Sequence, residues 1–124
     1  MAFELPSLTH FVGSRHTFRI PLFQVADDGT QTPLPLTGYR VVVSVLAASG
    51  QITYKDSARG SIEVKIIDPG FIEFTLLVTD LIGEKSSLAA SYQVMLDVPG
   101  ATTTQPRGAV AAGQGRMELV ARAA

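Results

Sequence analysis

Two histidines are the side chains best suited to bind a metal or move a proton near neutral pH. His10 and His16 lie on either side of Gly13-Ser14, and Glu4 is the nearest carboxylate. This spacing matches no zinc signature, and the chain has no cysteine to complete one. We therefore predict that both histidines are structural or face solvent.

The carboxylates are candidates for calcium binding or for paired acid–base catalysis. Asp27-Asp28-Gly29 lacks the alternating acids and the closing Glu of an EF-hand loop, so we predict a plain turn there. Glu63 and Glu73 fall on strands that we expect to be neighbours. Because both alternate with apolar residues, they are predicted to lie on a solvated sheet face and not to form a glycosidase pair.

Serine and glycine patterns indicate no further chemistry. No serine stands in a Gly-x-Ser-x-Gly elbow, and the glycines form no phosphate loop. Gly113-Gln114-Gly115 matches only the first half of a dinucleotide fingerprint and precedes a predicted strand. We predict a protein that is not an enzyme, with no catalytic, cofactor-binding or metal-binding residue, no cofactor and no small-molecule substrate.

The composition favours one folded domain. Hydrophobic residues make up 46% and charged residues 17% of the 124 residues, which excludes intrinsic disorder. Ten basic and eleven acidic residues give a formal charge of −1, so we expect no nucleic-acid partner. The mean hydropathy of +0.26 is high for a small soluble monomer and indicates that neighbours cover some of the apolar surface, in line with the homo-oligomer that we expect.

Targeting signals are not predicted. The N-terminal residues show no basic stretch followed by a long apolar run, so we expect no signal peptide. The longest apolar stretches, such as Val41 to Ala48, are too short to span a bilayer, so we expect no membrane partner. The absence of cysteine fits synthesis in a reducing cytoplasm.

Hydrophobic residues alternate with a period of two along most of the chain, as in half-buried strands. Pro21 has no backbone donor, so its strand is expected at a sheet edge or at a bulge. Tyr39 to Ala48 is expected to be a central strand, because both of its faces are largely apolar. About seven short strands are predicted, within residues 17–23, 39–48, 51–55, 62–67, 71–78, 91–98 and 116–122.

The connecting segments complete the predicted fold. Residues 32–38 contain two prolines and are expected to be an extended crossover loop. Thr79 to Gly83 fits a single helical turn, and residues 99–115 fit a long loop rich in Ala, Thr and Gly. The prediction is an all-β fold, an antiparallel β-sandwich over residues 15–124 that follows an extended N-terminal arm, residues 1–14.

The order of these motifs resembles the small immunoglobulin-like modules of tailed-bacteriophage virion proteins, such as the N-terminal domain of upper baseplate proteins. The likeness covers roughly residues 15–122, and it departs from the pattern at Pro35, where an acid is usual, and in a longer Ala101 to Gly115 loop. The matching motifs are Thr17 to Leu22, Leu36-Thr37-Gly38, Tyr39 to Val43, Gly70 to Leu76, Tyr92 to Leu96 and Gly115 to Val120. The resemblance implies an immunoglobulin-like sandwich in a phage particle, built from many symmetric copies.

We therefore expect a non-enzymatic structural component of a bacteriophage virion, in its tail, baseplate or fibre attachment. It is expected to be made in the host cytoplasm, to be located in the virion and to dock on other virion structural proteins. A capsid decoration or cement protein is an alternative. A receptor- or carbohydrate-binding module is an alternative of another class, although the chain has no Trp and only Tyr39, Tyr54 and Tyr92 as tyrosines.

Two segments are predicted to dock on partners. Apolar side chains on the arm cost free energy in water unless something covers them, and the alternative is that the arm packs on its own domain. The small-residue loop suits ordering against a partner, and the alternative is a surface loop of an isolated monomer. Exposed sheet edges are a third site for a partner strand. The predicted docking residues are Phe3, Leu5, Leu8, Phe11 and Val12 in the arm and Thr102, Thr103, Thr104, Gln105 and Arg107 in the loop.

Overall fold

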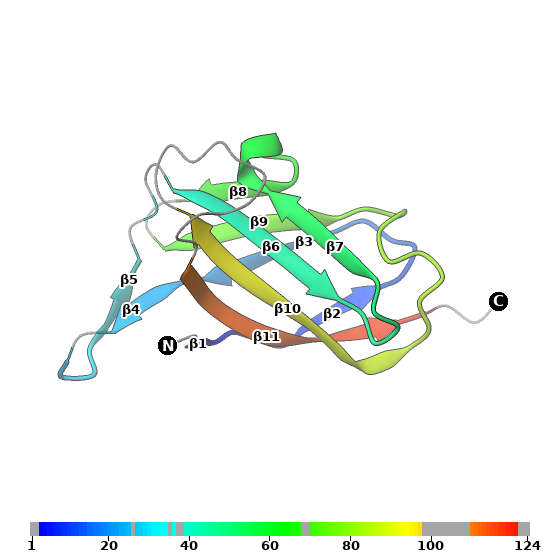
Figure 1. Cartoon of the computed structure of the whole chain (residues 1–124), viewed down its shortest axis with the longest axis horizontal. Coiled ribbons are helices and arrows are strands. Elements are labelled where there is room, and N and C mark those ends of the chain that lie inside the picture. The colour runs from blue at the N-terminus through cyan, green and yellow to red at the C-terminus, as the bar shows by residue number, and fades with distance from the viewer. Residues whose placement is uncertain are drawn as a thin grey trace.

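The computed structural model describes residues 3–25, 27–34, 36, 39–67, 70–97 and 110–121. These residues form an all-β fold in which two sheets pack against each other, with one short 3₁₀ helix (Figure 1). The elements are β1 (Phe3–Glu4), β2 (Leu8–Phe11), β3 (His16–Pro21), β4 (Phe23–Val25), β5 (Gln31–Pro33), β6 (Arg40–Leu46), β7 (Ile52–Asp56), η1 (Ser57–Arg59), β8 (Val64–Ile67), β9 (Phe71–Leu76), β10 (Ser87–Asp97) and β11 (Val110–Val120). No helix in these ranges is long and apolar enough to cross a membrane.

The large sheet has the order β1-β11-β10-β6-β7, and β2 also pairs with β11. Strands β6, β7, β10 and β11 are antiparallel, whereas β1 and β2 run parallel to β11. Strand β6 lies between β10 and β7, so the predicted central strand is confirmed. Val41, Val43 and Val45 of β6 are fully buried toward the other sheet.

The small sheet has the order β3-β9-β8, with both pairs antiparallel. Strand β3 is at the edge of this sheet, as the missing donor of Pro21 predicted. The outer face of the sheet carries Arg19, Glu73 and Lys65 side by side in register. Opposite charges on neighbouring strands stabilise such a pairing by a few tenths of a kcal/mol, or about 1 kcal/mol at most.

The core lies between the two sheets. Three aromatic rings cross it, with ring centroids 5.2 Å apart for Phe18 and Phe74 and 6.1 Å apart for Phe74 and Tyr92. Apolar side chains from both sheets and from the loops between them complete the buried cluster. Its other members are Leu5, Ile20, Leu22, Leu36, Val41, Val43, Val45, Ala47, Val64, Ile72, Leu76, Leu81, Ala90, Val94, Met117 and Leu119.

Strands β4 and β5 form a separate two-stranded ribbon that extends from one end of the molecule (Figure 1). Residues 32–38 were predicted as a crossover loop, and the structure places Thr32 and Pro33 in β5 instead. Asp27-Asp28-Gly29 makes the turn of this hairpin, with Gly29 at a φ of 86°. That conformation favours glycine, because a Cβ would clash with the backbone.

Two ion pairs hold β7 and the segments around it. Lys55 Nζ lies 2.7 Å from Asp80 Oδ2, and both side chains are largely buried. Arg40 Nε donates to Asp56 Oδ1 at 3.1 Å, and this hydrogen bond holds the pKa of the Asp56 carboxyl below its ordinary value. These contacts join β6, β7 and the turn after β9.

Three expectations about local structure are corrected. Residues 79–83 form turns and not a helical turn, because Leu81 is fully buried at a positive φ of 57°. Residues 110–115 belong to β11, so the predicted loop at 99–115 ends earlier than expected, and residues 99–109 lie outside the described residues. The described part of the chain has eleven strands in place of about seven, because β1, β2, β4 and β5 come from segments predicted as arm or loop.

Candidate functional site

The predicted arm is part of the large sheet. Residues 3–11 contribute β1 and β2, and both strands pair with β11. Leu5 is buried in the core, Leu8 and Val12 are half-buried, and Phe11 is 48% exposed. The structure therefore corresponds to the alternative in which the arm packs on its own domain. Among the side chains described for this segment, Phe11 is the predicted docking residue that remains on the surface.

Backbone and side-chain hydrogen bonds fasten the arm along its length. The backbone N–H of Leu5 donates to Gln114 O at 2.8 Å, and that of Val12 donates to Val120 O at 2.9 Å. Between them, the hydroxyl of Tyr92 donates to Pro6 O at 2.5 Å. Burial raises the pKa of the Tyr92 hydroxyl, so this donor stays protonated at any physiological pH.

The five predicted loop residues, Thr102, Thr103, Thr104, Gln105 and Arg107, lie outside the described residues.

The two histidines occupy different environments. His10 is fully buried, its ring lies edge-on to Phe18, and neither of its ring nitrogens has a hydrogen-bond partner among the residues that the structure describes. Burial and the nearby His16 lower the pKa of His10, which favours the neutral ring. His16 is exposed and its ring stacks on that of Phe18, with ring centroids 4.2 Å apart. Among the described residues, no group of three His, Cys, Asp or Glu side chains is placed to hold a metal ion.

The two acids considered as a catalytic pair have separate partners. Glu63 forms an ion pair with Arg59 at 3.2 Å and accepts a hydrogen bond from the Asp56 backbone N–H at 3.2 Å. Glu73 lies in register between Arg19 and Lys65. Glu63 is therefore explained by its ion pair and its hydrogen bond, and Glu73 by its place opposite basic residues on the outer face of the small sheet.

Arg59 and Glu63 also cover part of the outer edge of β7. The guanidinium of Arg59 donates to Tyr54 O at 3.0 Å, while Glu63 binds the next outward-facing N–H of the strand. Side chains that occupy edge donors and acceptors hinder pairing with another chain. The β7 edge of the large sheet is consequently a poor site for the addition of a partner strand that the sequence suggested.

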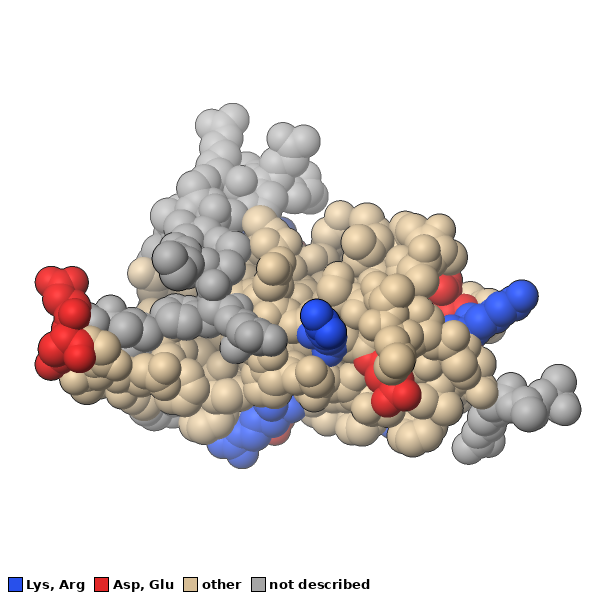
Figure 2. Space-filling view, turned by 90° about the horizontal axis from the view of Figure 1, so that it is seen from below, with Lys and Arg blue, Asp and Glu red and all other residues tan. Residues whose placement is uncertain are grey.

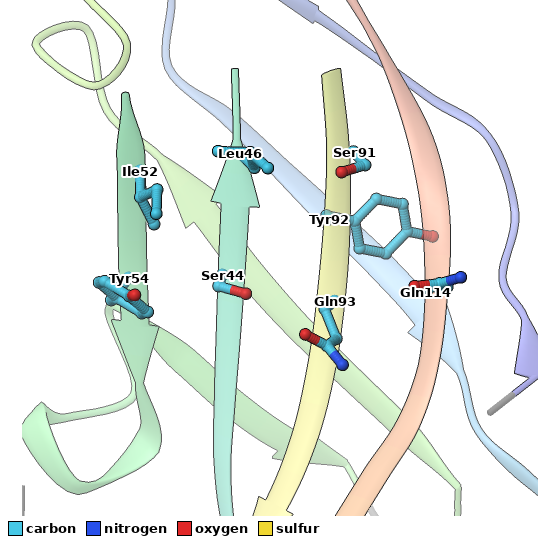
Figure 3. A pocket seen from close by; sticks show the side chains of 8 residues that line it. All are labelled: Ser44, Leu46, Ile52, Tyr54, Ser91, Tyr92, Gln93 and Gln114. Atoms are coloured by element: carbon cyan, nitrogen blue, oxygen red, sulfur yellow. The ribbon is translucent and has the colours of Figure 1, made fainter. Parts of the chain in front are cut away.

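A shallow groove crosses the outer face of the large sheet and is a candidate site built from described residues (Figure 3). Its volume is about 350 Å³, near the lower end for ligand pockets in proteins. Four strands contribute its walls, and none of the lining side chains is charged. The lining residues are Ser44, Leu46, Ile52, Tyr54, Ser91, Tyr92, Gln93 and Gln114.

Strand register explains how these side chains come together. Ser44 lies opposite Tyr54 on one side and Gln93 on the other, and Gln93 lies opposite Gln114. These four residues form a polar row across β7, β6, β10 and β11. A second row, two residues further along the strands, contains Ile52, Leu46 and Ser91. Tyr92 faces the core instead, and its ring forms the floor beside β11.

The two ends of the molecule present different surfaces. Acidic side chains gather at the tip of the β4–β5 hairpin, where the turn contains Asp27 and Asp28 (Figure 2). The side chain of Thr30 and then its backbone N–H, which donates to Asp28 Oδ1 at 2.9 Å, lower the pKa of that carboxyl. At the opposite end, the segment from β9 to β10 exposes apolar side chains, with Ile82 67% and Leu88 76% exposed.

Sequence reasoning did not find the groove, because its residues are far apart along the chain and meet only through strand register. The signal that was present is the alternation itself. Ser44 and Gln93 each stand between residues with buried side chains, so each had to point outward. Which strands lie next to each other was not determined by that alternation.

Comparison of the chain with protein-family models and with curated proteins found no match.

Proposed function

We propose that this protein is a non-enzymatic structural component of a bacteriophage virion, in a tail, baseplate or fibre attachment, that acts by docking on other virion proteins and on copies of itself. The resemblance to phage modules gives the setting. The geometry of the β4–β5 hairpin supports the docking role.

An immunoglobulin-like topology is part of this proposal. Immunoglobulin-type sandwiches place the strands named G, F and C in one sheet and B, E and D in the other, and some add C′ beside C. If β3, β6, β7, β8, β9, β10 and β11 take the places of B, C, C′, D, E, F and G, both sheet orders of this chain agree with that arrangement. The seven-strand core of the sequence prediction would then be these seven strands.

The hairpin is the observation that carries the docking proposal. A two-stranded ribbon is marginally stable on its own in water. Here Leu22 and Leu34 anchor only its base, through a backbone hydrogen bond of 3.0 Å, while residues 27–33 are exposed. Such an extension costs conformational entropy that the domain itself does not offset by burial. Packing against a neighbouring subunit supplies the missing contacts.

The first test is the composition of purified particles. Mass spectrometry of particles made by the phage or prophage that encodes the chain is expected to detect the protein in a fixed ratio to other virion proteins. Separated tails and capsids then distinguish a tail component from a capsid decoration protein. Absence of the protein from particles that infect normally would contradict the proposal.

The second test addresses the hairpin. A double variant, Asp27→Lys with Asp28→Lys, reverses the charge at the tip without touching the core. We expect it to fold normally but to incorporate into particles at least tenfold less well when supplied in place of the wild-type protein. Lys85→Glu is the matched control, because it reverses an exposed charge near the opposite end. Equal incorporation of the tip variant would show that the hairpin is not the docking element.

A further inference from the structure

We propose that the groove on the outer face of the large sheet binds a neutral glycan. The inference rests on the chemistry of its lining and does not depend on the proposed role in a virion. Three properties carry it: an uncharged row of hydrogen-bonding side chains, an exposed aromatic ring at one end of that row, and a rigid support beneath.

The hydrogen-bonding side chains of the two rows match the groups that a sugar presents. Ser44, Ser91, Gln93 and Gln114 can each donate and accept a hydrogen bond, as a sugar hydroxyl also does. None of these four side chains forms a hydrogen bond with another described residue of the chain. Their full capacity is therefore directed to the solvent side of the groove, where a polyhydroxylated ligand can replace water.

An aromatic ring supplies the apolar contact. Tyr54 is 56% exposed at one end of the polar row, and Ile52 and Leu46 lie beside it with nearly half of their surfaces exposed. One face of a pyranose ring carries only C–H groups, which pack well on an aromatic ring and on aliphatic side chains. Tyr54 suits this contact because it combines a large apolar body with a polar tip.

The rows also have the length of an extended ligand. Strands are spaced about 4.8 Å apart, so the row from β7 to β11 spans roughly 14 Å across three intervals. This is the length of a short oligosaccharide lying across the strands. The groove is shallow, so we expect a chain to lie along it and not a single small molecule to be enclosed.

The electrostatics select a neutral glycan over charged ligands. Charged residues flank the lining in register, at Arg116 opposite Ser91, at Glu4 beside Gln114 and at Asp56, two residues along β7 from Tyr54. An acidic glycan or a nucleic acid needs several cations along its path, and the groove offers none among its lining residues. A protein partner would gain little from a concave strip of amides and hydroxyls, since binding energy at protein interfaces concentrates in buried aromatic and Arg anchors.

The support of the groove keeps its side chains in place before a ligand arrives. Ser44 and Gln93 lie on β6 and β10, which are paired on both sides. Sites built on such strands hold their geometry better than sites built on loops. Weak binding of a glycan is then expected with little change in the backbone.

The test begins with the full chain on an array of neutral and acidic oligosaccharides. The neutral probes include cellohexaose, maltohexaose and the hexamer of N-acetylglucosamine. We expect reproducible binding to at least one neutral glycan. An NMR titration with that glycan is expected to shift the side-chain amide signals of Gln93 and Gln114 and the backbone signals of Ser44.

Variants then assign the contact. Tyr54→Ala is expected to weaken binding at least tenfold, and Gln93→Ala at least threefold, both with unchanged circular dichroism spectra. Tyr39→Ala is the matched control, because it removes an exposed aromatic ring outside the groove, and it should bind as the wild type does.

Four results would overturn the proposal. They are no binding to any neutral glycan on the array, binding to acidic glycans alone, titration shifts that map away from the groove, and undiminished binding by Tyr54→Ala. If no glycan binds while Tyr54→Ala abolishes association with a purified protein partner, the face is a protein-docking surface instead.

Discussion

Tyr92 and Gly115 lie directly opposite each other on β10 and β11, and the ring of Tyr92 covers the glycine. A Cβ added at Gly115 would lie 2.6 Å from Tyr92 Cε1 and 2.8 Å from its hydroxyl oxygen. Real Cβ atoms do not approach other atoms so closely, so the Gly115→Ala variant must displace the ring. The ring is buried between the sheets and its hydroxyl holds Pro6 O, so displacement disturbs the core and loosens the arm.

The cost follows from two effects. Inserting a methyl group into a well-packed core costs about 1–3 kcal/mol. Losing the Tyr92 hydrogen bond adds about 0.5–1.5 kcal/mol. We therefore expect Gly115→Ala to lower the free energy of unfolding by about 2–4 kcal/mol, which corresponds to a decrease in Tm of roughly 10 °C for a domain of this size.

The assay is urea unfolding followed by circular dichroism, combined with a double-mutant cycle. Tyr92→Phe removes the hydroxyl alone and should cost about 1 kcal/mol. In a Tyr92→Leu background the methyl group of Gly115→Ala has room, so its additional cost should fall below about 1 kcal/mol. Gln114→Ala, which faces outward on the same strand, is the control and should be nearly neutral. Equal costs of Gly115→Ala with and without the aromatic ring would refute the reasoning.

Three further predictions concern buried polar groups and the arm. The pKa of His10 lies below its ordinary value of 6.5 in the folded protein, so the unfolded chain binds the proton first as the pH falls. The free energy of unfolding should therefore decrease as the pH falls below about 6.5. His10→Phe should remove this dependence when unfolding is compared between pH 7.5 and pH 5. Asp80→Ala leaves the ammonium of Lys55 buried without its partner and should lower the free energy of unfolding by about 3–5 kcal/mol. Lys55→Met should lower it by less, because Asp80 keeps its 2.6 Å hydrogen bond from the Leu77 N–H. Comparable decreases for the two variants in urea unfolding would contradict this order. Deletion of residues 1–12 removes β1 and β2 and should destabilise the fold by several kcal/mol, so a truncated chain that unfolds at the wild-type temperature would contradict the sheet pairing.

The strands that the sequence predicted well are those in which alternation and burial agree. Fully buried side chains alternate with less buried ones in both β6 and β9, and each strand is found at the predicted place. The fully buried residues include Val41, Val43 and Val45 in β6 and Ile72 and Phe74 in β9. These patterns are local, so they can be read without knowing which strands are neighbours.

The elements that were missed depend on contacts between distant segments. The Ala- and Gly-rich start of β11 has low strand propensity, yet it pairs with β10 and β1. Tertiary pairing overrides propensity in such cases. Leu81 combines a positive φ with a fully buried side chain, which no local pattern reports. The groove also depends on contacts between distant segments, since Tyr54 and Gln114 come together only through strand order.

Pairing of the first strands with the last one governs when the domain can be completed during synthesis. Phe3 pairs with Gly113 and Leu8 with Met117, so β1 and β2 leave the ribosome long before β11 does. Contacts between such distant segments form slowly, because a long loop must close first. A polypeptide interrupted before β11 lacks the neighbour of β1, β2 and β10 and exposes their unpaired backbone, which favours aggregation. The large sheet is therefore complete only once β11 has been synthesised.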